Sequence, residues 1–233
     1  MFNILKLLKD IFAPKKCYSC NKEWHFLCEQ CLLNMSIFDP ICYVCKGKSN
    51  YFNVHNNCLC DVYYDKVIVL SHYKEKIISK LIKDLKFYQK RDIAEDFWVY
   101  LSDLFIENEI YKNTQDYFIL YPPMWFFKKL KRWYNHSEVL AKVISSNIGI
   151  KIQKNLIKKV KSTRQQSTLN RQNRLTNLKD CFKVNKNHID NIDKKIFIII
   201  DDVISTWTTI NEISRILKNA WASKVIWLII ASD

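Results

Sequence analysis

Two adjacent aspartates, Asp201 and Asp202, end an apolar run in the stretch IIIDDVISTWTT at residues 198–209. The turn after them carries small hydroxyl side chains around one tryptophan, namely Ser205, Thr206, Trp207, Thr208 and Thr209. Hydroxyls and the free N–H groups at the start of a helix bind phosphate groups. Carboxylates beside such a site bind sugar hydroxyls or a Mg²⁺ ion. The alternative, that the acids cap a turn and the threonines cap a helix, explains one aspartate better than two.

Cysteines near the N-terminus form a second group of residues with recognisable chemistry. Eight of the nine cysteines lie there, in three pairs separated by two residues and one pair separated by one, at Cys17, Cys20, Cys28, Cys31, Cys42, Cys45, Cys58 and Cys60. Four thiolates complete a tetrahedral structural zinc site, so eight predict two such sites. The simplest pairing is sequential, four cysteines to each zinc, and a crossed pairing also fits the spacing. His25 and His55 are not assigned as ligands, because the cysteines already fill both sites.

A disulfide framework is the alternative for these cysteines, and it would need an oxidising compartment. The first twelve residues, MFNILKLLKDIF, predict a short amphipathic helix and lack the small-residue cleavage site of a signal peptide. The longest apolar runs, such as residues 225–231, are far too short to span a bilayer. We therefore expect zinc sites in a cytoplasmic protein.

After the cysteine-rich part, strand-like and helix-like segments alternate, which predicts an α/β domain. The expected division is a zinc module at residues 1–62 and an α/β domain at 63–233. Apolar runs predict strands at 66–73, 116–123, 194–200 and 223–230. Helical spacing of apolar residues predicts helices at 74–87, 91–107, 135–148 and 208–220, with Gly149 ending the third. The last strand, helix and strand predict a right-handed parallel unit, whose strand ends are where ligands bind.

Composition supports a folded protein with an anionic partner. The chain has 233 residues, 48% hydrophobic and 26% charged, which is typical of a globular protein. Its net charge of +14 favours nucleic acid or phosphate compounds as partners, or simply reflects a lysine-rich surface. Residues 139–179 carry ten Lys or Arg and no Asp or Glu. That stretch suits a lid over a departing pyrophosphate or a contact with a nucleic-acid backbone.

The aspartate stretch resembles the phosphoribosyl pyrophosphate (PRPP) motif of type I phosphoribosyltransferases, in which two acids precede Thr, Thr, Gly, any residue and Thr. Residues 120–142 resemble the segment of the competence protein ComF family in which a proline-rich strand end precedes Arg-Gly-Phe-Asn. Residues 163–182 resemble a loop of the same family, with matching residues at Gln166, Leu169, Arg174, Asn177 and Phe182. The resemblance spans nearly the whole chain. It implies a double zinc ribbon followed by a phosphoribosyltransferase-like parallel sheet flanked by helices.

The resemblance also implies roles for individual residues. Asp201 and Asp202 are expected to contact the ribose hydroxyls of PRPP, and residues 205–209 to hold its 5′-phosphate. The turn at 120–124 is expected to face the pyrophosphate and Mg²⁺. A flexible basic loop and the pyrophosphate side are expected to contribute Arg132, Arg164, Gln166 and Arg174.

Two glycines of the family motifs are replaced by tryptophan, at Trp207 and Trp133. Glycine permits a positive φ and close backbone approach, both of which tryptophan disfavours. Two hypotheses follow. In the first, the chain binds PRPP with Mg²⁺, acts as a phosphoribosyltransferase when active, and serves DNA uptake in natural competence. In the second, it is a non-catalytic zinc-containing scaffold that binds single-stranded DNA or a helicase and retains a degenerate PRPP site.

Overall fold

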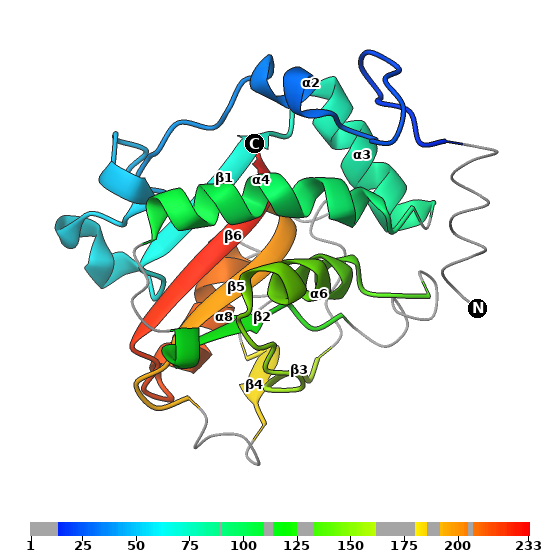
Figure 1. Ribbon diagram of the computed structural model, residues 1–233. Helices are drawn as coiled ribbons and strands as arrows, with labels where there is room; N and C mark the ends of the chain where they lie inside the picture. The colour runs from blue at the N-terminus through cyan, green and yellow to red at the C-terminus, as the bar shows by residue number, and fades with distance from the viewer. Residues whose placement is uncertain are drawn as a thin grey trace.

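A four-stranded parallel sheet forms the centre of the protein, with the strand order β1-β6-β5-β2 (Figure 1). The computed structural model describes residues 14–88, 90–109, 114–124, 133–161, 180–185, 192–204 and 207–233. The sheet strands are β1 (Lys66–His72), β2 (Tyr117–Leu120), β5 (Ile196–Ile204) and β6 (Lys224–Ser232). A separate antiparallel pair consists of β3 (Ile157–Lys159) and β4 (Phe182–Val184). The four predicted strands are confirmed, whereas the three-residue strands of the separate pair are too short to leave a pattern in the sequence.

Helices cover both faces of the sheet (Figure 1). One face carries α4 (Ile93–Asn108) and α6 (His136–Ile148), the other carries α8 (Trp207–Lys218), and α3 (Lys76–Phe87) packs beside α4. All four predicted helices of the domain are confirmed, and Gly149 ends α6 with a φ of 72°. The helix expected in the first twelve residues lies outside the described residues. Among those described, no helix combines the length and apolar character needed to cross a membrane.

The central strands β5 and β6 run parallel, and α8 connects them, as predicted. Both strands read as nearly continuous apolar runs, because each is covered by helices on both faces. β5 does not stop at residue 200 as predicted. Its pairing continues from Asp201 opposite Ile229 to Ile204 opposite Ser232. The two aspartates therefore lie within the strand, held in place by ladder pairing rather than by a turn.

The cysteine-rich segment packs along the outer edge of β1. It contains α2 (Glu29–Leu33), η1 (Asn50–Phe52) and η2 (Asn56–Asp61), and a further short helix, η3 (Thr114–Asp116), precedes β2. Isolated bridges join Ile37 to Ser71 and Asn53 to Lys66, so this segment covers an edge that would otherwise be open to other strands. Its buried side chains belong to the same hydrophobic core as the sheet. The boundary between residues 62 and 63 stays a prediction.

A buried group of three charges fixes the amino ends of the strands. The Glu109 carboxylate, at the end of α4, lies 2.7 Å from Lys66 Nζ and 2.6 Å from Lys224 Nζ. The side chains of Glu109 and Lys66 are only 3% and 4% exposed. Burial alone would raise the pKa of Glu109, but the two lysines outweigh it and lower the pKa. The group ties α4 to the first residues of β1 and β6.

Replacing Glu109 by Ala would leave the Lys66 ammonium buried without a counter-charge. We expect Glu109→Ala to lower the free energy of unfolding by about 3–5 kcal/mol, measured by urea denaturation. Glu107→Ala, on the exposed side of the same helix, is the matched control and should change it by no more than about 0.5 kcal/mol. Equal small effects of both variants would show that the buried group does not stabilise the fold.

Candidate functional site

Asp201 and Asp202 lie where the carboxyl end of β5 meets the start of α6 and the end of α3. Ser137 Oγ donates a hydrogen bond of 2.7 Å to Asp201 Oδ1. Asp202 Oδ2 lies 2.6 Å from Lys86 Nζ and 3.5 Å from His136 Nε2. Asp202 is only 3% exposed, while Asp201 is partly exposed. The structure thus surrounds the predicted acids with three side chains that the sequence pattern does not single out.

The two carboxyl groups have opposite electrostatic character. Burial would raise the pKa of Asp202, but Lys86 and His136 outweigh burial and hold this pKa well below its usual range. Burial raises the pKa of Asp201, and the negative charge of Asp202 raises it further. Asp202 is therefore a fixed anion, and Asp201 is the carboxyl group that takes up a proton first. The N-terminus of α6, with its partial positive charge, favours both anions.

The same residues form a possible cation site. One ligand atom each from His136, Asp201 and Asp202 lie within 4.8 Å of one another. Carboxylate oxygens suit Mg²⁺. Since Lys86 already neutralises Asp202, an added cation would bind mainly through Asp201 and through oxygens of a ligand.

The predicted phosphate loop is described only in part. Helix α8 begins at Trp207, one residue earlier than predicted, and Thr208 and Thr209 lie half-buried in its first turn. The structure does not describe Ser205, Thr206 or the side chain of Trp207. The residues expected on the pyrophosphate side also lie outside the described part of the chain, namely Arg132, Arg164, Gln166 and Arg174. Two residues therefore separate the end of β5 from the start of α8.

Trp133 stands where the resemblance expects a glycine, and its backbone keeps a glycine-like conformation. Its φ is 64°, in the left-handed region that bulky residues rarely adopt. Such a conformation costs on the order of 1–3 kcal/mol. The side chain is 78% exposed and so avoids the interior. The backbone just before α6 thus adopts the left-handed conformation that a glycine at this position would permit.

The first group of four cysteines comes together as the sequential pairing predicts, and it could hold a zinc ion. The sulfur atoms of Cys17, Cys20, Cys28 and Cys31 all lie within 4.8 Å of one another. Burial would raise the pKa of Cys17, but backbone N–H groups outweigh it and lower the pKa to about 6. A thiol that ionises this readily is suited to bind zinc, and four cysteine sulfurs in one group fit a closed structural site.

In the second group, a histidine stands where a cysteine is expected. Cys42, Cys45 and Cys58 come together with His55, whose Nδ1 lies 3.3 Å from Cys45 Sγ. His55 Nε2 lies 2.9 Å from the Lys48 carbonyl, so this nitrogen donates a hydrogen bond and Nδ1 is free to bind a metal. Cys60 is not in the group, and its Sγ donates a hydrogen bond of 3.6 Å to the Asn57 carbonyl. The donor set fits zinc as three sulfurs and one nitrogen.

The two candidate metal sites have the same backbone arrangement, and the spacing of their ligands in the sequence indicates it. The residue after each of segments 17–20 and 42–45 has a φ of 61° and donates a backbone hydrogen bond to the first cysteine. Segments 28–31 and 55–58 then close the sites, each with a backbone hydrogen bond from its last residue to its first. His55 and Cys58 have the same separation as Cys28 and Cys31, whereas Cys58 and Cys60 do not. Spacing therefore favours the histidine.

Zinc content distinguishes the two ligand sets for the second site. We expect Cys60→Ser to retain two zinc ions per chain and His55→Ala to retain one, as measured by elemental analysis of the purified protein. Cys58→Ser is the positive control and should also lose one. Loss of zinc from Cys60→Ser combined with retention in His55→Ala would restore the set of four cysteines.

Lys86 is the cation on which the buried acid pair depends. We expect Lys86→Met to lower the free energy of unfolding at pH 8 by about 3–5 kcal/mol, because Asp202 is left buried and unpaired. The stability that Asp202 contributes in the native protein is present above the usual aspartate pKa and is lost as pH falls. In the variant, burial is no longer opposed by Lys86 and raises the pKa of Asp202, so the carboxyl group takes up a proton more readily as pH falls. The loss of stability in Lys86→Met should therefore be smaller at pH 5 than at pH 8. Lys83→Met, at an exposed position of α3, should show neither effect in chemical denaturation at both pH values.

Together, the fold and the sites define a class of protein: a parallel α/β domain with paired acids at its ligand edge, joined to a cysteine-rich module able to hold two zinc ions. The chain is 29% identical over 229 residues to Competence protein F of Haemophilus influenzae, which covers 93% of this chain and 96% of that protein. It is 24% identical over 170 residues to DNA utilization protein YhgH of Escherichia coli K12 and of Salmonella typhimurium, covering 70% of the chain and 71% of each relative. These relatives confirm the resemblance to the competence protein ComF family. No protein-family model matches the chain.

Proposed function

We propose that this protein binds PRPP with Mg²⁺ at the carboxyl end of β5 and, when active, transfers its phosphoribosyl group. The observation that carries the proposal is the acid pair, which lies in a central parallel strand that ends two residues before α8 begins. This edge of a parallel sheet is where α/β proteins bind phosphate-bearing ligands. A half-buried helix start beside two carboxyl groups suits a ligand that carries both a phosphate and a sugar.

The two acids would take different roles. Asp202, paired with Lys86, would keep the site in shape and supply a constant negative field. Asp201 is partly exposed, so its carboxylate would accept hydrogen bonds from the ribose hydroxyls and stabilise positive charge developing on the sugar. The first turn of α8 and residues 205–209 would hold the 5′-phosphate. The basic residues Arg132, Arg164 and Arg174, with Gln166, would approach the pyrophosphate.

The names of the relatives support placing this activity in DNA uptake. One relative is described as a competence protein and others as DNA utilization proteins. We extend that setting to this chain as part of the proposal.

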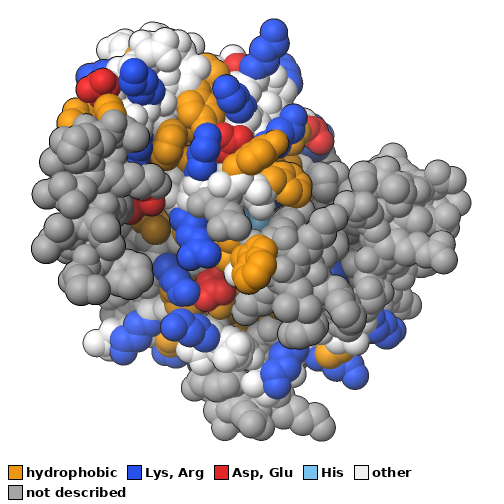
Figure 2. All heavy atoms as spheres, turned by 90° about the vertical axis from the view of Figure 1, so that its right-hand side faces the viewer, with side chains coloured by type: hydrophobic (Ala, Val, Ile, Leu, Met, Phe, Trp, Pro, Cys, Tyr) orange, Lys and Arg blue, Asp and Glu red, His pale blue; other side chains and the backbone are white. Residues whose placement is uncertain are grey.

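A second function, binding single-stranded DNA or a helicase as a scaffold, is favoured by one surface. The net charge is +14, and Figure 2 shows a face on which many Lys and Arg side chains surround a few hydrophobic ones. Exposed aromatic side chains such as Tyr88 (70% exposed) and Trp133 could stack on bases.

PRPP binding can be tested by thermal unfolding. We expect saturating PRPP with Mg²⁺ to raise the melting temperature by about 5 °C or more, because a ligand at a hundred times its Kd adds about 2.7 kcal/mol. Asp201→Asn should abolish the rise, since the amide cannot supply the carboxylate charge. Asp193→Asn, at an exposed position before β5, should preserve it.

The absence of any rise at millimolar PRPP in the native protein would overturn the first function. Salt-dependent affinity for single-stranded DNA in the same preparation would then favour the second.

A further inference from the structure

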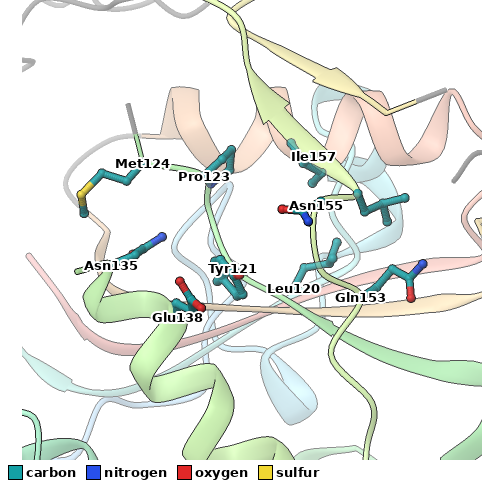
Figure 3. A pocket seen from close by; sticks show the side chains of 10 residues that line it. Leu120, Tyr121, Pro123, Met124, Asn135, Glu138, Gln153, Asn155 and Ile157 are labelled. Atoms are coloured by element: carbon teal, nitrogen blue, oxygen red, sulfur yellow. The ribbon is translucent and has the colours of Figure 1, made fainter. Parts of the chain in front are cut away.

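A groove of about 790 Å³ lies between the short antiparallel pair β3–β4 and the second half of α8. A smaller pocket of about 170 Å³ lies on the β3 side of this pair, where Ile157 lines it together with Leu120 and Pro123, at and just after the end of β2 (Figure 3). The β3 side therefore faces the end of the central sheet, and β4 is the strand that borders the large groove.

The groove follows the edge of β4 that faces away from β3. All three residues of this strand line it, namely Phe182, Lys183 and Val184. Side chains on one face of a strand come from every second residue, so three consecutive lining residues indicate that the groove runs along the strand's edge. Among the described lining residues none belongs to β3 itself, and only Val160 and Lys161, which follow its end, reach the groove.

Backbone groups on this edge are available for hydrogen bonds. Val160 N donates a hydrogen bond of 2.8 Å to the Cys181 carbonyl. Opposed residues of an antiparallel pair alternate between bonded and non-bonded pairs, so the next pair, Lys159 opposite Phe182, is non-bonded. The same holds for Val184, two residues further on. The N–H and C=O groups of Phe182 and Val184 therefore point away from β3, and the described residues contain no third strand on that side.

Apolar side chains line the space beside this edge. Val184 of β4 and both Ile216 and Ala220 of α8 are half-buried, so part of their surface stays open to a ligand. Phe182 is only 3% exposed and joins β4 to the core. A strand placed along β4 would direct every second side chain toward α8. The groove therefore suits an extended chain in which alternate residues are apolar.

The charge of the groove is positive. Lys161 and Lys183 are exposed, and neither has an ion-pair partner within the described part of the chain. Asp180 and Arg215, the other charged residues described in the lining, pair with each other at 3.2 Å. Lysines on an open strand edge disfavour pairing with a second copy, because like charges would meet. They favour a partner strand that carries carboxylates.

We propose that this groove binds an extended acidic segment of a partner protein, which joins β4 as a third strand. The outward N–H and C=O groups of Phe182 and Val184 pair with the backbone of the segment and provide affinity. Its alternate apolar side chains pack on Ile216, and its carboxylates pair with Lys161 and Lys183, which provides specificity. The interaction does not depend on PRPP, since neither acid of the pair in β5 lines the groove.

Fluorescence anisotropy with a labelled peptide, Asp-Val-Glu-Ile-Asp-Val-Glu, tests the proposal on the native protein. We expect saturable binding. Lys161→Glu combined with Lys183→Glu should weaken it by about tenfold or more, because attraction becomes repulsion. Lys151→Glu combined with Lys154→Glu makes the same change in net charge at exposed positions outside the groove. This control should bind the peptide as the native protein does.

Two methylated peptides test whether the segment binds as a strand. In one the apolar residues carry backbone N-methyl groups, and in the other the acidic residues carry them. Successive N–H groups of a strand point to opposite sides, so only one of these peptides loses its hydrogen bonds to β4. We expect that peptide to lose binding and the other to bind as the unmodified peptide does.

Several outcomes would overturn the proposal. Absence of binding at millimolar peptide, equal affinities of the two methylated peptides, or unchanged affinity after charge reversal at Lys161 and Lys183 would each do so. Equally effective displacement of the peptide by a thymidine oligonucleotide of the same charge would overturn it in favour of nucleic acid. Sedimentation of the native protein as a dimer that the peptide dissociates would overturn it in favour of a second copy.

Discussion

The neutralisation of Asp202 is the constraint on which the arrangement of this protein depends. A carboxylate 97% buried at the end of a central strand requires a cation, and Lys86 provides it from the last turn of α3. Lys86 reaches that position because α3 is itself held by the zinc module. Asp84, two residues earlier, accepts a hydrogen bond of 2.5 Å from the Tyr18 hydroxyl, next to the first zinc ligand. The metal module therefore supports the acid pair through one helix.

The parallel sheet separates two kinds of charge at its two ends. At the amino ends, Glu109 is enclosed by Lys66 and Lys224, so the three charges of this group are paired with one another. At the carboxyl ends, Asp202 is balanced, but Asp201 is held by a neutral hydroxyl and keeps a raised pKa. One end is thus closed by ion pairs within the protein, while Asp201 at the other end is held by the uncharged donors Ser137 Oγ and the Asp202 N–H. This difference is physical support for a ligand at the carboxyl end, independent of any resemblance.

The sequence alone predicts the fold well, because long apolar runs indicate buried strands and apolar residues at helical spacing indicate helices. It predicts less of the site. Lys86 and His136 lie 116 and 66 residues before Asp202, on helices whose other positions look like ordinary amphipathic patterns. Nothing local marks them, since their importance arises from where the helices end in space. The fourth ligand of the second metal site is a different case. The spacing between His55 and Cys58 favours the histidine, but eight cysteines are already enough for two sites, so the sequence alone gives no need for a histidine ligand.

The two tryptophans that replace family glycines differ in what they require of the backbone. At Trp133 the backbone keeps the left-handed conformation, so a bulky residue has been accommodated at a cost in strain by turning the side chain outward. At Trp207 the backbone belongs to the first turn of α8, where φ is negative in any residue and glycine is not needed for conformation. The main conformational objection to a working phosphate loop is therefore removed at this position.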